Sequence, residues 1–172
     1  TRHFERDAAP DELKSLGMHD LKQTFERAEL CARCHVGDSR HDLHHDMLAA
    51  GHPPLRFEFS SYHARLPQHW RGPADAPAQG REALALWTAG QLASAAVALE
   101  LTASRAAAAA STPAGAEDAA AWPELAEYDC LACHQRLRPA IGPAPRGFRA
   151  APLVGLPAWS RWHHRLAIPL AE

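Results

Sequence analysis

The sequence has few methionines, no excess of basic residues and no long apolar run. It contains two methionines in 172 residues, and 18 Lys and Arg are balanced by 20 Asp and Glu, for a net charge of −2 at pH 7. Nucleic-acid-binding domains usually carry a clustered positive excess, so this balance argues against such a partner. Charged residues such as Arg105 interrupt the apolar runs, and none approaches the roughly 18 residues of a membrane helix. We therefore expect no nucleic-acid partner and no membrane span.

A start signal is also missing. The chain begins with Thr1 rather than methionine, and no charged start followed by an apolar stretch marks a signal peptide. We therefore expect a processed chain or a piece of a longer one. Its 172 residues have room for a moderate core, so residues 1–172 are expected to form a single domain.

Strand-like alternation is nearly absent, and helical spacing of apolar residues dominates. Segments rich in proline and glycine separate the helical patterns and predict loops. The expected fold is mainly α with long irregular loops that wrap a cofactor around a helical hairpin. The first expected helix covers Pro10–Ala32 with a break at Gly17, and a short histidine-rich helix capped by Asp42 and ended by Gly51 follows it. A loop is expected over Pro53–Pro77. The expected hairpin consists of helices over Gly80–Ser111 and Ala116–Leu137, the second with a break at Pro123, and an irregular tail begins at Pro139.

Cysteine is scarce, and its arrangement is the strongest signal in the sequence. The four cysteines form two pairs, each followed at once by histidine: Cys31-Ala32-Arg33-Cys34-His35 and Cys130-Leu131-Ala132-Cys133-His134. C-x-x-C-H is the attachment motif of c-type haem. The two-residue gap lets both sulfurs reach the haem vinyl groups, and the histidine binds the iron beneath the ring. Two motifs that use every cysteine predict two covalent haems with His35 and His134 as proximal ligands.

Three other roles for the cysteine pairs stay open. A zinc ribbon joins its pairs through about 15–20 residues, whereas residues 35–129, 95 in all, lie between Cys34 and Cys130. A thioredoxin-like redox pair belongs to a βαβ unit, which the sequence lacks. Plain disulfides are the third alternative. Haem attachment is favoured over all three.

Histidine is abundant where methionine is rare. The sequence has 12 histidines, and Met18 and Met47 are its only methionines. A low-spin electron-transfer haem needs a second axial ligand, usually His or Met, so histidine is the expected sixth ligand of iron. On the short histidine-rich helix, His45, Ala49 and His52 share one face if the helix persists that far. His45 and His52 are therefore candidate distal ligands.

Several segments of the chain resemble a known family. Four segments are similar to multihaem c-type cytochromes: RAELCARCHVGD, HHDMLAAGHPPLRFEFSSY, LPQHW and EYDCLACHQRL. Together with the stretches that connect them, they run from about residue 3 to residue 137. That group includes the tetrahaem electron acceptor of hydroxylamine oxidoreductase. The AAGHP-x-L-x-FE block after a C-x-x-C-H is much more specific than the motif alone. The resemblance implies closely packed bis-His haems that pass single electrons.

The resemblance also implies roles for individual histidines. Residues corresponding to His52 and His45 commonly serve as distal ligands, not always to the haem nearest in sequence. His3 matches a histidine that follows a further upstream motif, which implies that the chain is the C-terminal part of a longer cytochrome. His3 or His45 would then bind a haem attached elsewhere. Relatives often carry a histidine where this chain has Gln135, so that ligand role is vacant here or passes to another residue, such as His163.

The motifs and the resemblance together predict electron transfer through bis-His haems. The expected partners are redox proteins, either other cytochromes or subunits of a larger complex. Because c-type haem is attached outside the cytoplasm, a periplasmic or otherwise extracytoplasmic location is expected. Two other functions stay open. A multihaem oxidoreductase would leave one iron with an open coordination position for small nitrogen or sulfur compounds, and a structural protein would use its haems as wires within a larger assembly.

Overall fold

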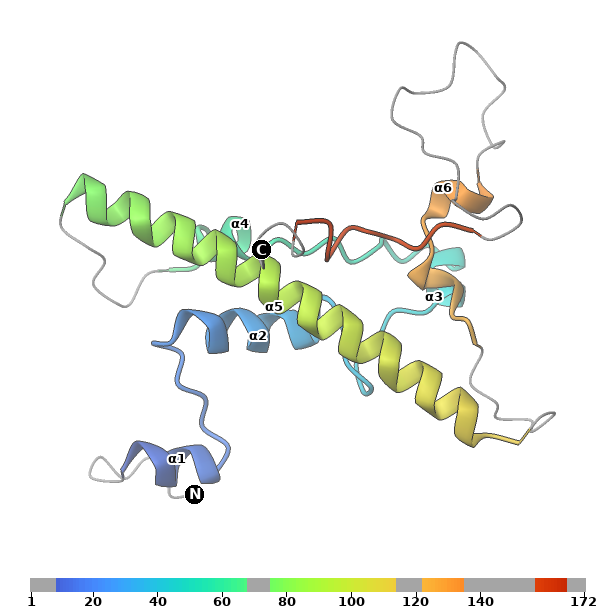
Figure 1. Cartoon of the computed structure of the whole chain (residues 1–172), viewed down its shortest axis with the longest axis horizontal. Helices are drawn as coiled ribbons and strands as arrows, with labels where there is room; N and C mark the ends of the chain where they lie inside the picture. Colours follow the sequence, from blue (N-terminus) through green and yellow to red (C-terminus); the bar gives the residue numbers. More distant parts are fainter. Residues whose placement is uncertain (1–8, 68–74, 114–121, 135–156, 167–172) are drawn as a thin grey trace, which may run out of the picture.

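The computed structural model of the chain describes residues 9–67, 75–113, 122–134 and 157–166 (Figure 1). Within these ranges the regular structure is helical, with no β-strand beyond two isolated bridges. This confirms the expected mainly α class with long irregular connections. The elements are α1 (Pro10–Ser15), α2 (Thr24–His35), α3 (His45–Ala49), α4 (Phe59–His63), α5 (Ala76–Ser111), the 3-10 helix η2 (Leu125–Glu127) and α6 (Cys130–Cys133).

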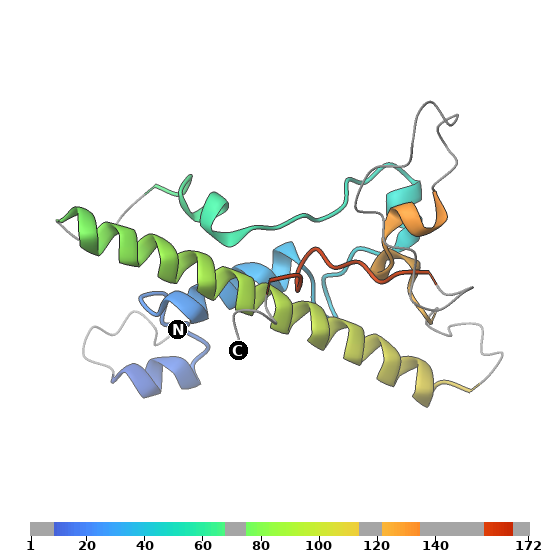
Figure 2. The same cartoon turned by 45° about the horizontal axis from the view of Figure 1, so that its top comes forward.

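The longest element is α5, whose 36 residues are rich in alanine, the strongest helix former. Asp75 caps its start, because the carboxylate accepts a hydrogen bond from the amide of Ala78 at 2.6 Å. Thr112 ends the helix in an extended conformation, which the following Pro113 favours. At about 1.5 Å per residue the helix is ~54 Å long, and it forms the axis along which α2 and α4 lie (Figures 1 and 2). The helix expected over Gly80–Ser111 is confirmed, with four more residues at its start.

The core lies where α2 packs along α5 (Figures 1 and 2). Ala28 and Ala32 of α2 are completely buried, as is Ala93 of α5, and Val97 is 1% exposed. The distance between packed helices depends on the side chains at the contact, and alanine lets the two backbones approach closely. The alanine spacing of both helices therefore fixes which side of α2 faces inward.

The helix expected over Pro10–Ala32 is interrupted more widely than predicted. The break at Gly17 is confirmed, with a φ of +88° that favours glycine, but the α-helix does not resume until Thr24. At its other end α2 continues three residues beyond the expected boundary, to His35. The first C-x-x-C-H is therefore helical throughout.

Gly90 of α5 is in direct contact with Phe59, the first residue of α4. A Cβ atom at Gly90 would lie 2.6 Å from the Cβ of Phe59, whose side chain is only 1% exposed. Gly90→Ala is therefore expected to destabilise the protein by about 1–3 kcal/mol through overpacking, although alanine favours a helix by ~1 kcal/mol over glycine. Chemical denaturation measures this change in the free energy of unfolding.

Gly80→Ala on the same helix is the matched control. Nothing lies within 4 Å of a Cβ atom at Gly80, so the substitution is expected to stabilise the protein by about 0.5–1 kcal/mol. Equal effects at Gly80 and Gly90 would contradict the packing of α4 on α5.

The prediction of a second hairpin helix over Ala116–Leu137 is wrong for residues 122–134. These residues form only η2 and the four-residue α6, with extended backbone between them. Pro123 has no amide hydrogen to give to a helix, and Tyr128 instead forms an isolated β-bridge with Trp159. The pairing of Tyr128 with Trp159 thus replaces the expected helix. The helix that packs on α5 is α2 instead of a hairpin partner. The rest of the expected helix lies outside the described residues.

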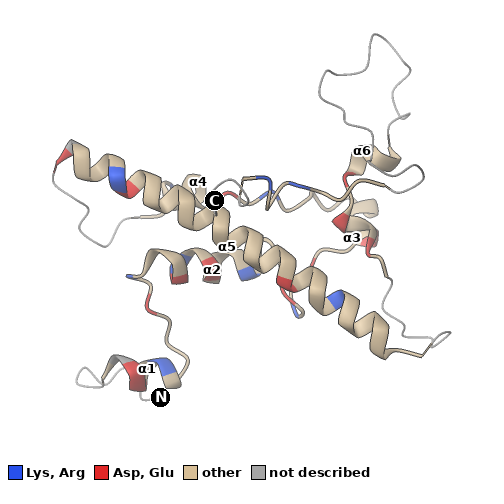
Figure 3. Cartoon of the chain, in the orientation of Figure 1, with Lys and Arg blue, Asp and Glu red and all other residues tan. Residues whose placement is uncertain are grey.

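By length and composition alone, α5 qualifies as a helix that could cross a membrane. Its Pro77–Ser111 portion contains an 18-residue window of mean hydropathy 1.3, and few charged residues lie along it in Figure 3. The sequence reading therefore underestimated this apolar stretch. Of this window 33% is buried inside the protein, and length and composition alone do not distinguish a membrane helix from the core helix of a soluble protein. The absence of a membrane span stays a prediction.

Candidate functional site

The first C-x-x-C-H motif forms the last turns of α2. Ala32 is completely buried in the core shared with α5, which turns the other side of the motif outward. Cys31 is half-buried, and Cys34 and His35 are exposed. Burial raises the pKa of the Cys31 thiol, partly offset by the positive charge of Arg27. Residues three apart lie on the same side of a helix, so both thiols can bond to one flat group outside the core.

Two aromatic rings pack against the histidine of this motif. Phe57 is stacked on His35, with ring centroids 5.0 Å apart and an interplanar angle of 11°. The ring of Tyr62 is tilted against His35 at 5.2 Å. Phe57 and Phe59 are buried in the main core, whereas Tyr62 is exposed. The contacts also hold the His35 imidazole in a defined orientation beside the thiols.

The second motif has a similar helical form on α6. The carboxylate of Asp129 accepts a hydrogen bond from the amide of Leu131 at 2.9 Å and so caps the start of the turn. The amide of His134 donates to the carbonyl of Cys130 at 2.9 Å and closes it. Cys130, Cys133 and His134 are all exposed. Each motif therefore carries two thiols and an imidazole on one helical turn, with exposed groups that haem attachment can reach.

The histidine-rich helix predicted from the sequence is α3, which has only five residues. Gly51 follows its C-terminus with a φ of +104°, as predicted for the residue that ends it. The prediction that Asp42 caps its start is wrong, because His44 occupies the cap position and makes no side-chain cap bond. The carboxylate of Asp42 is instead paired with Arg105 of α5.

His45 and His52 lie in one short segment but not on one helical face. Because α3 ends at Ala49, the face expected to hold both histidines does not extend to His52. The exposed ring of His52 has its Nδ1 2.7 Å from the carbonyl oxygen of Pro53. A carbonyl oxygen only accepts hydrogen bonds, so Nδ1 carries the hydrogen and Nε2 keeps its lone pair. A neutral imidazole in this tautomer is suited to bind a metal through Nε2.

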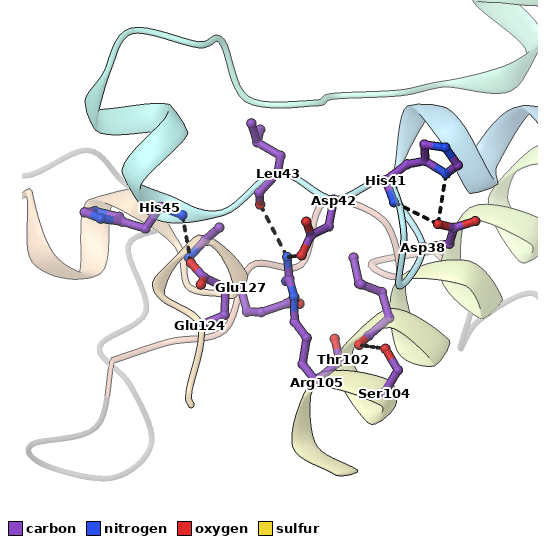
Figure 4. Close-up of polar contacts among 12 residues, drawn as sticks. Asp38, His41, Asp42, Leu43, His45, Thr102, Ser104, Arg105, Glu124 and Glu127 are labelled. Carbon is purple, nitrogen blue, oxygen red and sulfur yellow. Dashed lines mark hydrogen bonds and ion pairs between the residues drawn. The ribbon is translucent and has the colours of Figure 1, made fainter. Parts of the chain in front are cut away.

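Arg105 connects α3 to the segment of the second motif (Figure 4). Its side chain is 12% exposed and is paired with Asp42 at 2.9 Å and with Glu127 of η2. Glu124 accepts a hydrogen bond from the backbone amide of His45 at 2.8 Å. Charge-assisted bonds shielded from water are stronger than exposed ones, so this network places α3 beside η2 and α6. This network was not predicted from the sequence, although Arg105 stands out as a single charged residue within an alanine-rich run.

A cavity of about 1250 Å³ lies beside the second motif. Cys130 and Leu131 line one side of it, α5 contributes residues that include Trp87 and Leu101, and residues 54–58 and 159–166 line much of the rest. Sites for small ligands usually measure about 300–1,000 Å³, so this cavity has room for a large macrocycle. Cys130 is the thiol in its wall, so a flat group bonded to that sulfur could extend into the cavity.

The candidate residues are not gathered at one point. The helices α2 and α6, which carry the two motifs, lie apart in Figures 1 and 2, and His3 lies outside the described residues. All four cysteines are free thiols, so the disulfide alternative gains no support. Among the described residues, no three His, Cys, Asp or Glu side chains are grouped as metal ligands would be. The zinc alternative therefore gains no support either.

Comparison of the chain with protein-family models, with curated proteins and with solved structures found no match. The resemblance to multihaem cytochromes therefore depends on the sequence segments that carry it.

Proposed function

We propose that this protein carries electrons through c-type haems attached at Cys31 and Cys34 and at Cys130 and Cys133. The observation that supports this most is the pair of C-x-x-C-H motifs, which use every cysteine and lie on helical turns with exposed imidazoles. Bound haem supplies a one-electron iron couple whose potential is set by axial ligands and burial. The residues of the chain would attach the group and provide axial nitrogens.

Five histidines are assigned to the iron centres under this proposal. His35 and His134 are the proximal ligands, and the ring of His35 is held by its aromatic neighbours. His52 is a distal ligand, supported by the tautomer that its bond to a backbone carbonyl selects. His45 is a second distal candidate, and the resemblance assigns it or His3 to a haem attached further upstream. Histidine on both sides of the iron gives a rather low reduction potential.

The protein is proposed to act outside the cytoplasm, with other cytochromes or subunits of a redox complex as partners. Leu84 and Leu99 on α5 are 62% and 59% exposed. Leu99 lines the cavity beside the second motif, so Leu84 is the side chain of this pair that another protein would cover.

Spin state distinguishes this proposal from catalysis. Electron paramagnetic resonance of the oxidised, matured protein is expected to show low-spin iron only, because every haem has two histidine ligands. A high-spin component that responds to small nitrogen or sulfur compounds would contradict the proposal. It would favour the alternative of a multihaem oxidoreductase with one open coordination position.

A further inference from the structure

A histidine without an assigned role lies in the wall of the cavity beside the second motif. His163 lines this cavity, and Cys130 is the only one of the four cysteines that does so. Nδ1 of His163 is buried and has no hydrogen-bond partner among the residues that the structure describes. Buried polar atoms in proteins are nearly always partnered, so this nitrogen indicates a group that the polypeptide does not supply.

The protonation state of His163 suits a metal ligand. Burial lowers its pKa to about 4 and the neighbouring His164 reinforces this, whereas a hydrogen bond of the ring to the backbone of Leu55, which does not involve Nδ1, opposes it. The imidazole is therefore neutral at pH 7, with a lone pair available on one ring nitrogen.

The segment that carries His163 is fastened to the residues just before the second motif. Two backbone hydrogen bonds of 2.8 Å accompany the bridge between Tyr128 and Trp159, and the two rings lie 4.8 Å apart. On its other side, Trp162 packs under the guanidinium of Arg56, 5.4 Å from the ring centroid. His163 is thus held at a defined place next to the second motif.

We infer that His163 is the distal ligand of the haem attached at Cys130 and Cys133, on the opposite side of the iron from His134. The inference rests on the proposed function and adds to it the partner of one proximal histidine. It follows from the shared cavity, from the unpartnered nitrogen and from the pairing of the two segments. His52 is then available to a different haem.

The test compares His163→Ala with His164→Ala in the complete, matured protein. His163→Ala is expected to keep both haems but to convert one of them to high-spin iron, which binds carbon monoxide after reduction. His164→Ala, the neighbouring control, is expected to leave both haems low-spin. In a chain that also carries Cys130→Ala and Cys133→Ala, His163→Ala is expected to leave the spin state of the remaining haem unchanged, because the haem that His163 binds is absent.

Two more variants separate ligation from loss of structure. His163→Gly is expected to return to low-spin iron when imidazole is added, and His163→Met is expected to stay six-coordinate with a higher reduction potential. Low-spin spectra for both haems in His163→Ala, or a high-spin signal in His164→Ala alone, would overturn the inference. A matured chain without attached haem would overturn the proposed function itself.

Discussion

Replacing Cys31 and Cys34 together by alanine is expected to remove one of two haems and to destabilise the fold strongly. Without thioether bonds the macrocycle is held by axial ligands alone and is lost on purification. His35, which follows Cys34 in the chain, and Tyr62, which packs against His35, then lose the group that covers them. If that group covers on the order of 200 Å² of apolar surface, its loss costs about 5 kcal/mol at ~25 cal/mol per Å².

Haem content per chain and the midpoint of chemical denaturation measure this prediction. The matched variant replaces Cys130 and Cys133 by alanine. It is expected to lose the other haem and also to lose stability, because that haem would fill the cavity lined by Trp87 and Leu101 of α5. Two haems per chain in the Cys31→Ala/Cys34→Ala variant would show that these cysteines do not attach haem.

His52→Ala is expected to convert one haem from low-spin to high-spin iron while leaving haem content unchanged. The ring of His52 is exposed, and its bond to the carbonyl of Pro53 leaves Nε2 free for iron. Removal of the imidazole opens a coordination position, so the reduced protein gains carbon monoxide binding at that haem. Electron paramagnetic resonance and carbon monoxide titration measure the change.

His41→Ala is the control for this variant. His41 is also exposed and has its Nδ1 3.1 Å from a carboxylate oxygen of Asp38, so it resembles His52 in burial and in hydrogen bonding. It is expected to leave both haems low-spin. Spectra of His52→Ala that match those of His41→Ala would remove His52 from the list of ligands.

Features set by local sequence were predictable without the structure. The alanine-rich stretch of α5 forms the long helix, and Gly17 and Gly51 adopt the positive φ angles that interrupt or end helices. The two C-x-x-C-H motifs were identified by spacing alone, since attachment chemistry requires both sulfurs and the histidine within five residues.

Features that depend on distant residues were not predictable in the same way. Asp42 was expected to cap a helix, but its carboxylate is paired with Arg105, which is 63 residues away. The helix expected to pass through Tyr128 is replaced by a bridge to Trp159. Tertiary pairing overrides local propensity at both places. The cavity position of His163 likewise depends on this bridge, whereas the resemblance named His163 only as a residue that takes over the ligand role missing at Gln135.

Mass spectrometry of the complete, matured chain tests the central claim most directly. Thioether bonds survive denaturation, so the account predicts one haem at each of the two C-x-x-C-H motifs, and residues 1–172 then have the mass of the polypeptide plus two haems. It also predicts porphyrin absorbance that stays with the chain through extraction in acidified solvent. A mass equal to that of the bare polypeptide, with all four cysteines open to alkylation, would contradict it.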